Sequence, residues 1–210
     1  MDTRVGAQSS NPTQMILCGD QVLFTANNGV HGTELWGTNG RTTGMVKDLR
    51  AGSGSSDPQS LTLSNGRVFF SANTTSSGRE LYVTDGTLAG TALVKDINPG
   101  TSNSSPSNLV SFSYYHDVDR IVFTASDGLY GTELWVSDGT ATGTYLLDDT
   151  YPGPGSGSPG QLTVGDGHLY FVSNNGVDGR ELWHSDLTRF GTEMLRDINA
   201  GGSSSDPQSL

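Results

Sequence analysis

The chain has 210 residues, 29 of them glycine, and a formal net charge of −11 at pH 7. This acidity argues against nucleic-acid backbones and anionic membrane surfaces as partners, and no apolar run is long enough for insertion into a membrane. Charged residues make up only 16%, which is typical of turn-rich β structure rather than disorder. Cys18 is the single cysteine, so no intrachain disulfide can form, and we expect it to be a small core residue.

One sequence pattern occurs four times. GTELW at 32–36 returns as GRELY at 78–82, GTELW at 131–135 and GRELW at 179–183. A Phe lies ten residues before each Glu, and an Asp closes each unit, followed ten residues later by a Pro. Repetition at a fixed period of this length is typical of stacked repeat architectures.

The units differ in length only near expected turns. The unit is 48 residues long from Pro58 to Pro106, whereas the first unit lacks two residues between Gly44 and Asp48. The third unit gains five residues between Leu109 and Phe123. Insertions are tolerated in loops but shift side chains to the wrong face inside a strand, so the pattern indicates a folded repeat.

The second unit shows the expected elements in chain order. Residues 61–63 alternate as a first strand, and Asn65-Gly66 is a hairpin signal before a second strand at 68–72. A polar loop ending at Gly78 leads to a third strand at 80–84. The turn Asp85-Gly86-Thr87 then leads to a fourth strand near 92–97. No segment has a helical period.

Four short antiparallel strands per unit predict an all-β fold, a β-propeller of four four-stranded antiparallel blades. We expect a single repeat domain over residues 1–210, closed within one chain or forming half of an eight-bladed ring in a homodimer. Residues 1–11 and 207–210 are expected to be overlapping parts of flanking repeats, so that the chain is a piece of a longer array. The expected blades cover residues 12–57, 58–105, 106–158 and 159–206.

The segment Glu133–Thr140, ELWVSDGT, closely resembles the ELWxxDGT repeat of large bacterial secreted and surface proteins. The resemblance covers nearly the whole chain in four copies. It departs at Gly37–Gly40, at Leu187-Thr188, and at Asp148, where Lys is usual. The resemblance implies a propeller-like, non-catalytic module located outside the cell or on its surface.

The recurring polar and aromatic residues are expected to have structural roles in each repeat. An active site normally uses one constellation, whereas Glu34, Glu80, Glu133 and Glu181 recur with their surroundings. We therefore expect each Glu, and each turn Asp, to accept hydrogen bonds from backbone donors. The aromatic residues two positions after each Glu are expected in the core. They are Trp36, Tyr82, Trp135 and Trp183.

Cofactors are not expected, although acidic turns such as Asp138-Gly139-Thr140 and Asp148-Asp149 supply oxygen ligands that suit Ca²⁺. The four histidines lack ligand spacing for a transition metal. No GxSxG motif supports a nucleophilic serine.

The loop between the second and third strands varies from unit to unit. A fixed scaffold with changing loop tips is how loops carry recognition. The candidate ligand contacts are His31, Arg79, Tyr130, Asp178 and Arg180. Tyr114-Tyr115-His116, in the insertion of the third unit, is a second aromatic cluster.

From these patterns we expect a non-catalytic extracellular module, not an enzyme, that acts in binding or adhesion. Its expected partner is a glycan or a surface protein. One alternative is a structural spacer of a large surface protein. The other is a hydrolase with a site at the propeller axis, for which the first-strand segments offer no unique acidic or His residues.

Overall fold

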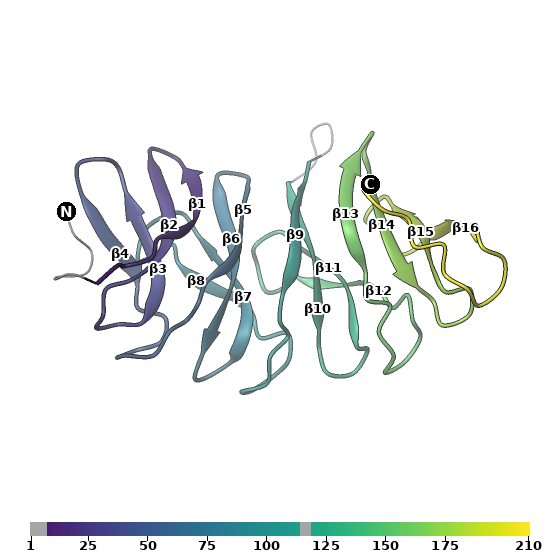
Figure 1. The fold of residues 1–210 in the computed structure, drawn as a ribbon, viewed down its shortest axis with the longest axis horizontal. Coiled ribbons are helices and arrows are strands. Elements are labelled where there is room, and N and C mark those ends of the chain that lie inside the picture. Colours follow the sequence, from purple (N-terminus) through teal and green to yellow (C-terminus); the bar gives the residue numbers. More distant parts are fainter. Residues whose placement is uncertain (1–7, 114–118) are drawn as a thin grey trace. The chain divides into compact units, whose positions relative to one another are not determined.

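The computed structural model describes residues 8–113 and 119–210, so Tyr114-Tyr115-His116 lies outside the described residues. Within that part the chain forms sixteen strands in four sheets and no helix, which confirms the all-β prediction (Figure 1). The chain divides into two compact units, residues 1–103 and 104–210, each with two sheets. No helix that could cross a membrane occurs in the described part of the chain.

Each sheet is an antiparallel meander in chain order. The first sheet contains β1 (Thr13–Cys18), β2 (Gln21–Asn27), β3 (Thr33–Thr38) and β4 (Thr43–Lys47). The second contains β5 (Gln59–Ser64), β6 (Arg67–Thr74), β7 (Gly78–Thr84) and β8 (Ala92–Lys95). The third contains β9 (Ser107–Phe112), β10 (Arg120–Ser126), β11 (Thr132–Ser137) and β12 (Tyr145–Asp148). The fourth contains β13 (Gly160–Gly165), β14 (His168–Asn174), β15 (Arg180–Ser185) and β16 (Thr192–Arg196).

The register gives every sheet the same two faces. Phe24 pairs with Trp36 and Thr25 with Leu35. Side chains alternate along a strand, so Phe24 and Trp36 share one side and Leu35 lies on the other. We call these sides the Phe face and the Leu face of each sheet. The Phe face carries Phe24, Phe70, Phe123 or Phe171, and the Leu face carries Leu35, Leu81, Leu134 or Leu182.

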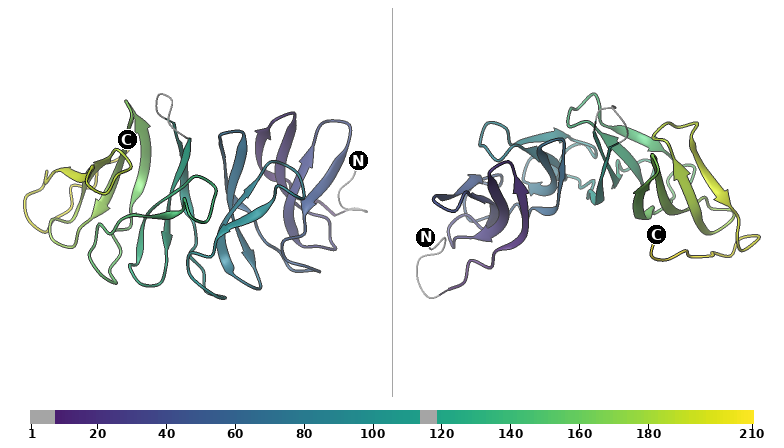
Figure 2. Two further views of the ribbon diagram at one scale, coloured as in Figure 1. Left: turned by 180° about the vertical axis from the view of Figure 1, so that it is seen from behind. Right: turned by 90° about the horizontal axis from the view of Figure 1, so that it is seen from above.

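Within each compact unit, the Leu face of one sheet packs on the Phe face of the next. In the first unit, Leu23 and Leu35 of the first sheet join one buried cluster with Phe70 and Tyr82 of the second. Figure 2 shows these two sheets side by side. In the second unit, the Leu face of the third sheet meets the Phe face of the fourth. That cluster includes Val122, Leu134, Leu147, Leu169, Phe171 and Trp183. Such contact buries both faces of a sheet, which explains the runs of consecutive apolar residues.

The structure corrects the position of the deletion in the first unit. Gly37 pairs with Gly44 as Val83 pairs with Ala92, so β4 aligns with β8 from its start. The two missing residues therefore fall in the turn after Asn39, not between Gly44 and Asp48. A deletion inside β4 would have moved its side chains to the opposite faces, whereas a shorter turn leaves the pairing intact.

The loop between the second and third strands lies against the connection that leads to the next sheet. The Thr33 N–H donates to Ser55 Oγ at 2.9 Å, and the Thr132 N–H donates to Ser156 Oγ at the same distance. Gly32 has φ +69°, and a Cβ there would overlap the Gly54 carbonyl. Glycine is required by this close approach.

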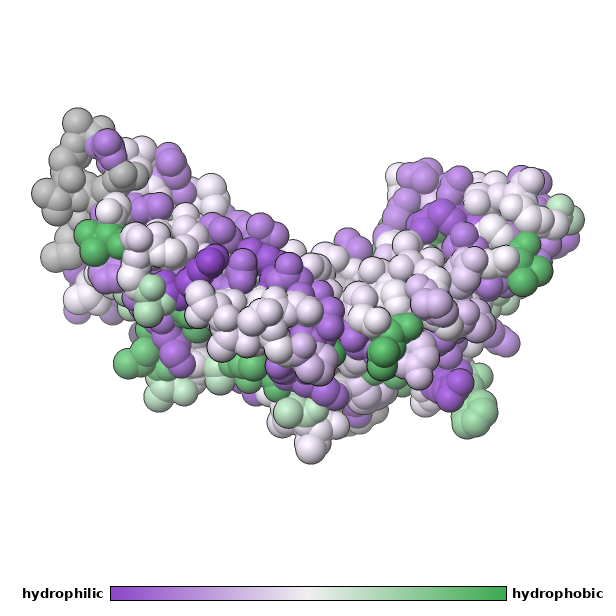
Figure 3. Space-filling view, turned by 90° about the horizontal axis from the view of Figure 1, so that it is seen from below, coloured by the Kyte–Doolittle hydropathy of each residue, from purple (hydrophilic) through white to green (hydrophobic). Residues whose placement is uncertain are grey.

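Apolar side chains on the surface are dispersed. Figure 3 shows one face of the molecule, on which they form several small groups among polar residues. Cys18 is buried in the core of the first unit, as expected, and burial raises the pKa of its thiol.

Candidate functional site

The repeated glutamates are buried acceptors of backbone hydrogen bonds. Glu34 Oε1 accepts the Ser56 N–H at 2.8 Å, while its Oε2 accepts the Ser56 hydroxyl at 2.6 Å and the Leu49 N–H at 3.2 Å. Glu80 accepts the Ile97 N–H at 3.0 Å. All four side chains are fully buried. The prediction that they satisfy backbone donors is confirmed, which removes them from the list of candidate catalytic groups.

Two of these carboxyl groups are hard to ionise. Burial raises the pKa of Glu133 to about 7, although Gly157 and Thr150 donate hydrogen bonds to it. Burial also raises the pKa of Glu34. For Glu181, burial acts in the same direction, but hydrogen bonds from Ser205 and Ile198 outweigh it and lower the pKa. The balance of desolvation and hydrogen bonding differs although the sequence motif does not.

The turn aspartates and the repeated aromatic residues also serve the frame. Asp85 Oδ1 accepts both the N–H and the hydroxyl of Thr87, at 2.9 and 2.7 Å, and Asp138 and Asp186 do the same with their own Thr. These bonds lower the pKa of all three carboxyl groups. Trp36, Tyr82, Trp135 and Trp183 are buried, which confirms that they belong to the core.

Four of the five candidate ligand contacts interact with their own loops or with neighbouring backbone. His31 Nδ1 lies 2.9 Å from Asn28 Nδ2, and Asp178 Oδ2 accepts from Asn175 at 2.8 Å. Arg79 Nη1 donates to the Asp57 carbonyl at 3.0 Å, and Arg180 Nη1 donates to the Ser158 carbonyl at 2.9 Å. Tyr130 is 41% exposed. The two cavities described in this section contain only Tyr130 from this set.

The acidic turns do not gather the side chains of a metal site. Within residues 8–113 and 119–210, no three His, Cys, Asp or Glu side chains cluster as ligands. Ca²⁺ takes six to eight oxygen ligands, and carboxylates normally supply several of them.

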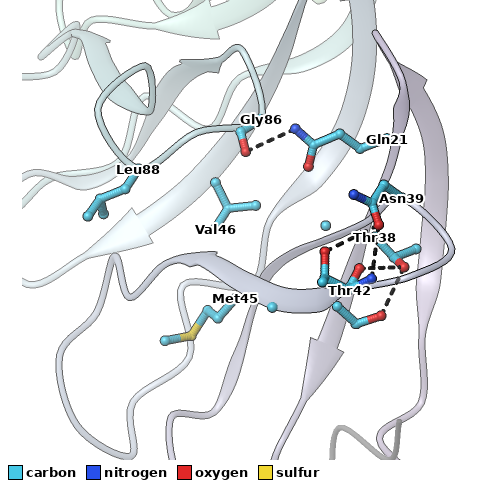
Figure 4. Close-up of a pocket in the computed structure, with 11 residues that line it drawn as sticks. Gln21, Thr38, Asn39, Thr42, Met45, Val46, Gly86 and Leu88 are labelled. Carbon is cyan, nitrogen blue, oxygen red and sulfur yellow. Dashed lines mark hydrogen bonds between the residues drawn. The ribbon is translucent and has the colours of Figure 1, made fainter.

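A cavity of about 350 Å³ in the first unit results from two departures from the repeat (Figure 4). Gly37 stands where β7 has Val83, and the turn after Asn39 is two residues shorter. Gln21 extends across the cavity, and its Nε2 donates to the Gly86 carbonyl at 3.5 Å. The cavity is lined by Gln, Asn, Thr, Gly, Met, Val and Leu residues. None of these ionises, so the cavity offers no acid–base chemistry.

A cavity of about 190 Å³ in the second unit has a different character. It is lined by Tyr130 and by Leu146, Leu147, Asp148, Asp149 and Arg189. β12 ends at Asp148, Tyr130 lies in the loop before β11, and Arg189 lies in the turn before β16. A carboxyl, a guanidinium and a phenol therefore line one small depression, although 59 residues separate Tyr130 from Arg189.

Asp148 is the side chain in this cavity with the most perturbed environment. Its side chain is 18% exposed, and Oδ1 lies 3.7 Å from Nε of Arg189, whose side chain is 79% exposed. Burial raises the pKa of Asp148, and the charge of Asp149 adds to that effect. Arg189 acts in the opposite direction but does not outweigh burial. An ion pair at this distance with one exposed partner is weak, which explains why desolvation dominates.

Asp149 is held by its surroundings. Its Oδ2 accepts the Gly153 N–H at 3.0 Å, and its buried Oδ1 has no hydrogen-bond partner. The corresponding Oδ1 atoms of Asp48, Asp96 and Asp197 are also buried without a partner. Asp149 thus belongs to the repeated frame and influences the site through its charge on Asp148.

Asp148 and Arg189 are not among the ligand contacts expected from the sequence. Both break the repeat, because the other units have Lys47, Lys95 or Arg196 at the first position and Leu88 or Ala141 at the second. The sequence signal was an acidic residue, Asp148, where the other units have a basic one, and a basic residue, Arg189, where other units have an apolar one. Sequence could not show that these two departures meet.

No family model and no curated protein matches the chain. Among solved structures, it is similar to a prolyl endopeptidase at 13% identity and a TM-score of 0.46, over 86% of this chain and 25% of that one. An α-L-arabinofuranosidase of Clostridium thermocellum is similar at 12% identity and a TM-score of 0.37, over 92% of this chain and 74% of that one. An exo-β-1,3-galactanase of Bifidobacterium bifidum is similar at 14% identity and a TM-score of 0.36, over 90% of this chain and 71% of that one. The chain thus spans a quarter of the endopeptidase.

All three similar structures are described as enzymes. This finding contradicts the expectation of a non-catalytic binding or adhesion module and the expectation that the protein is not an enzyme. At these identities and TM-scores, the similarities assign no residue and no substrate to this chain.

Proposed function

We propose that the protein is a hydrolase and that Asp148 is its general acid. The observation that supports this proposal is the meeting of Asp148, Tyr130 and Arg189 in one cavity. A buried carboxyl group with a raised pKa can hold a proton at a pH where an ordinary Asp has lost it.

The proposed reaction is hydrolysis of a glycosidic bond. Protonated Asp148 donates its proton to the leaving oxygen as the bond to the anomeric carbon breaks. Water then adds its oxygen to that carbon and returns a proton to Asp148, so that the carboxyl is restored. Among the six lining residues there is no Ser, Cys or His, which favours acid catalysis over acyl transfer by a side-chain nucleophile.

Arg189 and Tyr130 are proposed to position the sugar. The Arg189 guanidinium donates hydrogen bonds only, whereas the Tyr130 hydroxyl donates or accepts. The partly exposed Tyr130 ring also offers an apolar surface for a sugar ring. This site lies at loops and at the end of β12, not at the first strands, so the axial site considered from the sequence is not the one we propose.

The test uses unactivated oligosaccharides, because an aryl leaving group departs without an acid. Wild-type protein is expected to release reducing sugar from at least one member of a panel of plant and microbial oligosaccharides. Asp148→Asn should lower kcat by about 100-fold or more, in the range of general acid catalysis. Activity should fall as pH rises through the raised pKa of Asp148, because the acid must be protonated.

The repeat supplies a matched control for folding. Asp148→Lys installs the residue type that the first two units carry, where Lys47 Nζ donates to the Thr91 carbonyl at 2.7 Å. This variant should keep the melting temperature and lose activity. Asp178→Asn, in a loop outside the cavity, should keep both. An active Asp148→Asn enzyme, or a wild-type protein inactive on the whole panel, would overturn the proposal.

We also propose that the four sheets are propeller blades of the ELWxxDGT type and that the protein acts outside the cell on a glycan. The shared register and the stacking of faces within each unit support the first statement. The resemblance of the repeat motif supports the second. A proteinase-protection assay on intact producing cells tests the location.

A further inference from the structure

The cavity of about 350 Å³ in the first unit lies where the second unit is filled by side chains. Three of its lining residues are glycine at positions where the second unit has larger residues. They are Gly37, Gly44 and Gly86, against Val136, Tyr145 and Leu187. Val136 and Leu187 are buried in the core of the second unit, although both pairs of sheets stack through the same faces. The open volume therefore results from the residues of the first unit itself.

The same cavity lacks the charged residues that the second unit has at three corresponding positions. These positions hold Gln21, Asn39 and Leu88 in the first unit, and Arg120, Asp138 and Arg189 in the second. None of the eleven lining residues ionises. Burying a charged group without a partner of opposite charge is costly, and the net charge of −11 repels anions in particular. The cavity therefore favours a neutral ligand.

Gln21 offers hydrogen-bonding groups that the chain itself uses only weakly. Its Nε2 donates to the Gly86 carbonyl at 3.5 Å, which is the outer limit for such a bond. A primary amide carries two N–H donors and an acceptor oxygen. A Cβ on Gly37 would lie 2.9 Å from Gln21 Oε1, and a Cβ on Gly86 would lie 2.7 Å from Nε2. Glycine at both positions thus leaves the amide free space on either side, where a ligand can reach it.

One side of the cavity is a polar turn, and the other side is apolar. The turn is fixed by its own hydrogen bonds, since Asn39 Oδ1 accepts the Thr42 N–H at 2.9 Å and the Thr38 hydroxyl donates to the Thr42 carbonyl at 3.0 Å. Val46 and Leu88 lie on the other side (Figure 4). A rigid polar edge facing an apolar wall suits a ring that carries hydroxyl groups at its edge and C–H groups on its face.

We propose that this cavity of the first unit binds one neutral sugar unit. Its volume of about 350 Å³ lies near the lower end of the range for small-molecule sites, which suits a single ring rather than a long oligosaccharide. The Gln21 amide forms hydrogen bonds with the hydroxyl groups of the sugar, while Val46 and Leu88 contact its C–H face. This site goes beyond the proposed hydrolysis, because it needs no catalytic group and does not depend on the role of Asp148.

The experiment titrates the full chain, isotopically labelled, with the methyl β-glycosides of glucose, galactose and xylose. Nuclear magnetic resonance follows the side-chain amide of Gln21 and the N–H of Gly86, both of which line the cavity. At least one glycoside should shift both signals in a saturable way. The methyl β-glycoside of glucuronate, which is anionic, should bind about tenfold more weakly or worse than the glucoside, because the cavity offers no cation to pair with it.

Two variants test the cavity from opposite directions. Gly37→Val introduces the residue type of Val136 and should weaken binding by about tenfold or more, because its side chain enters the space beside Gln21. Gln21→Ala leaves the space open but removes the amide, and the Gly86 signal should report a similar loss. Should Gly37→Val fail to fold, Gln21→Ala decides alone.

Hydrolysis and sugar binding at this cavity can be lost separately. Asp148→Asn is the matched control, since it should lose hydrolysis while the Gln21 signals still respond to the glycoside. Gly37→Val should keep hydrolysis and lose the response. The proposal is overturned by a wild-type chain that shows no saturable shift with any of the three neutral glycosides. It is also overturned by a folded Gln21→Ala protein that binds as tightly as the wild type, or by a glucuronide that binds as tightly as the glucoside.

Discussion

Replacing Glu133 by Gln tests whether burial or hydrogen bonding dominates the contribution of this repeated carboxyl group to the free energy of unfolding. The side chain is fully buried and accepts two hydrogen bonds from Thr150, at 2.7 and 3.1 Å, and one from Gly157. Despite these donors, burial raises its pKa from 4.5 to about 7. The folded chain thus holds this proton more tightly than the unfolded chain does.

The sign of the pH dependence follows from that difference. Below pH 4.5 the group is protonated in both states, and its contribution to stability is fully present. As pH rises through about 7 the folded state must ionise a buried carboxyl, and the contribution is lost. The difference between 4.5 and about 7 corresponds to about 3 kcal/mol of unfolding free energy.

Urea unfolding of the wild type and of Glu133→Gln between pH 4.5 and about pH 8 measures this contribution. The amide cannot ionise, so the stability of the wild type minus that of the variant should fall with pH. Glu181→Gln, compared over the pH range below the ordinary value of 4.5, is the opposite control, since hydrogen bonds lower the pKa of Glu181 and the corresponding difference should rise with pH there. A wild-type-minus-Glu133→Gln difference that is flat or rises with pH would refute the reasoning, because the hydrogen bonds would then outweigh burial.

Three further stability changes can be measured by thermal or urea unfolding. Gly32→Ala should cost about 1–3 kcal/mol more than Gly40→Ala. Both residues have positive φ, but only a Cβ at Gly32 meets backbone, so equal costs would contradict the steric argument. Leu187→Gly should destabilise the folded chain by about 1–2 kcal/mol, because the loss of a buried Leu side chain outweighs the relief of backbone strain at its φ of 65°. A variant more stable than the wild type would show that the backbone strain is the larger of the two. Glu80→Ala should cost about 1–3 kcal/mol by leaving the Ile97 N–H unpaired, and an unchanged melting temperature would argue against this loss.

The strands and the role of the repeated residues could be predicted from sequence because their causes are local. Alternating side chains and turn residues define each strand within a few positions, and four copies of the pattern reinforce the same interpretation. The acceptor role of Glu34 followed from its recurrence with its surroundings, and its bonds to Leu49 and Ser56 lie within the same unit of the chain.

Local sequence could not show how departures from the repeat are compensated. Leu187 occupies the position where other turns have Gly40, Gly86 or Gly139 and adopts φ 65° there, because its side chain packs in the core of the second unit. Whether burial outweighs backbone strain depends on contacts with distant residues. The two-residue deletion was likewise misplaced, since only strand pairing distinguishes a shorter turn from a shorter strand.

The candidate site depended on tertiary structure. Asp148 and Arg189 were visible in the sequence as departures, but their common cavity with Tyr130 arises because the third and fourth sheets pack together. A repeating sequence determines the strands, turns and buried acceptors of each unit, because these depend on neighbours at fixed separations. Packing between sheets decides which irregular residues meet, because those contacts join positions that no local pattern relates.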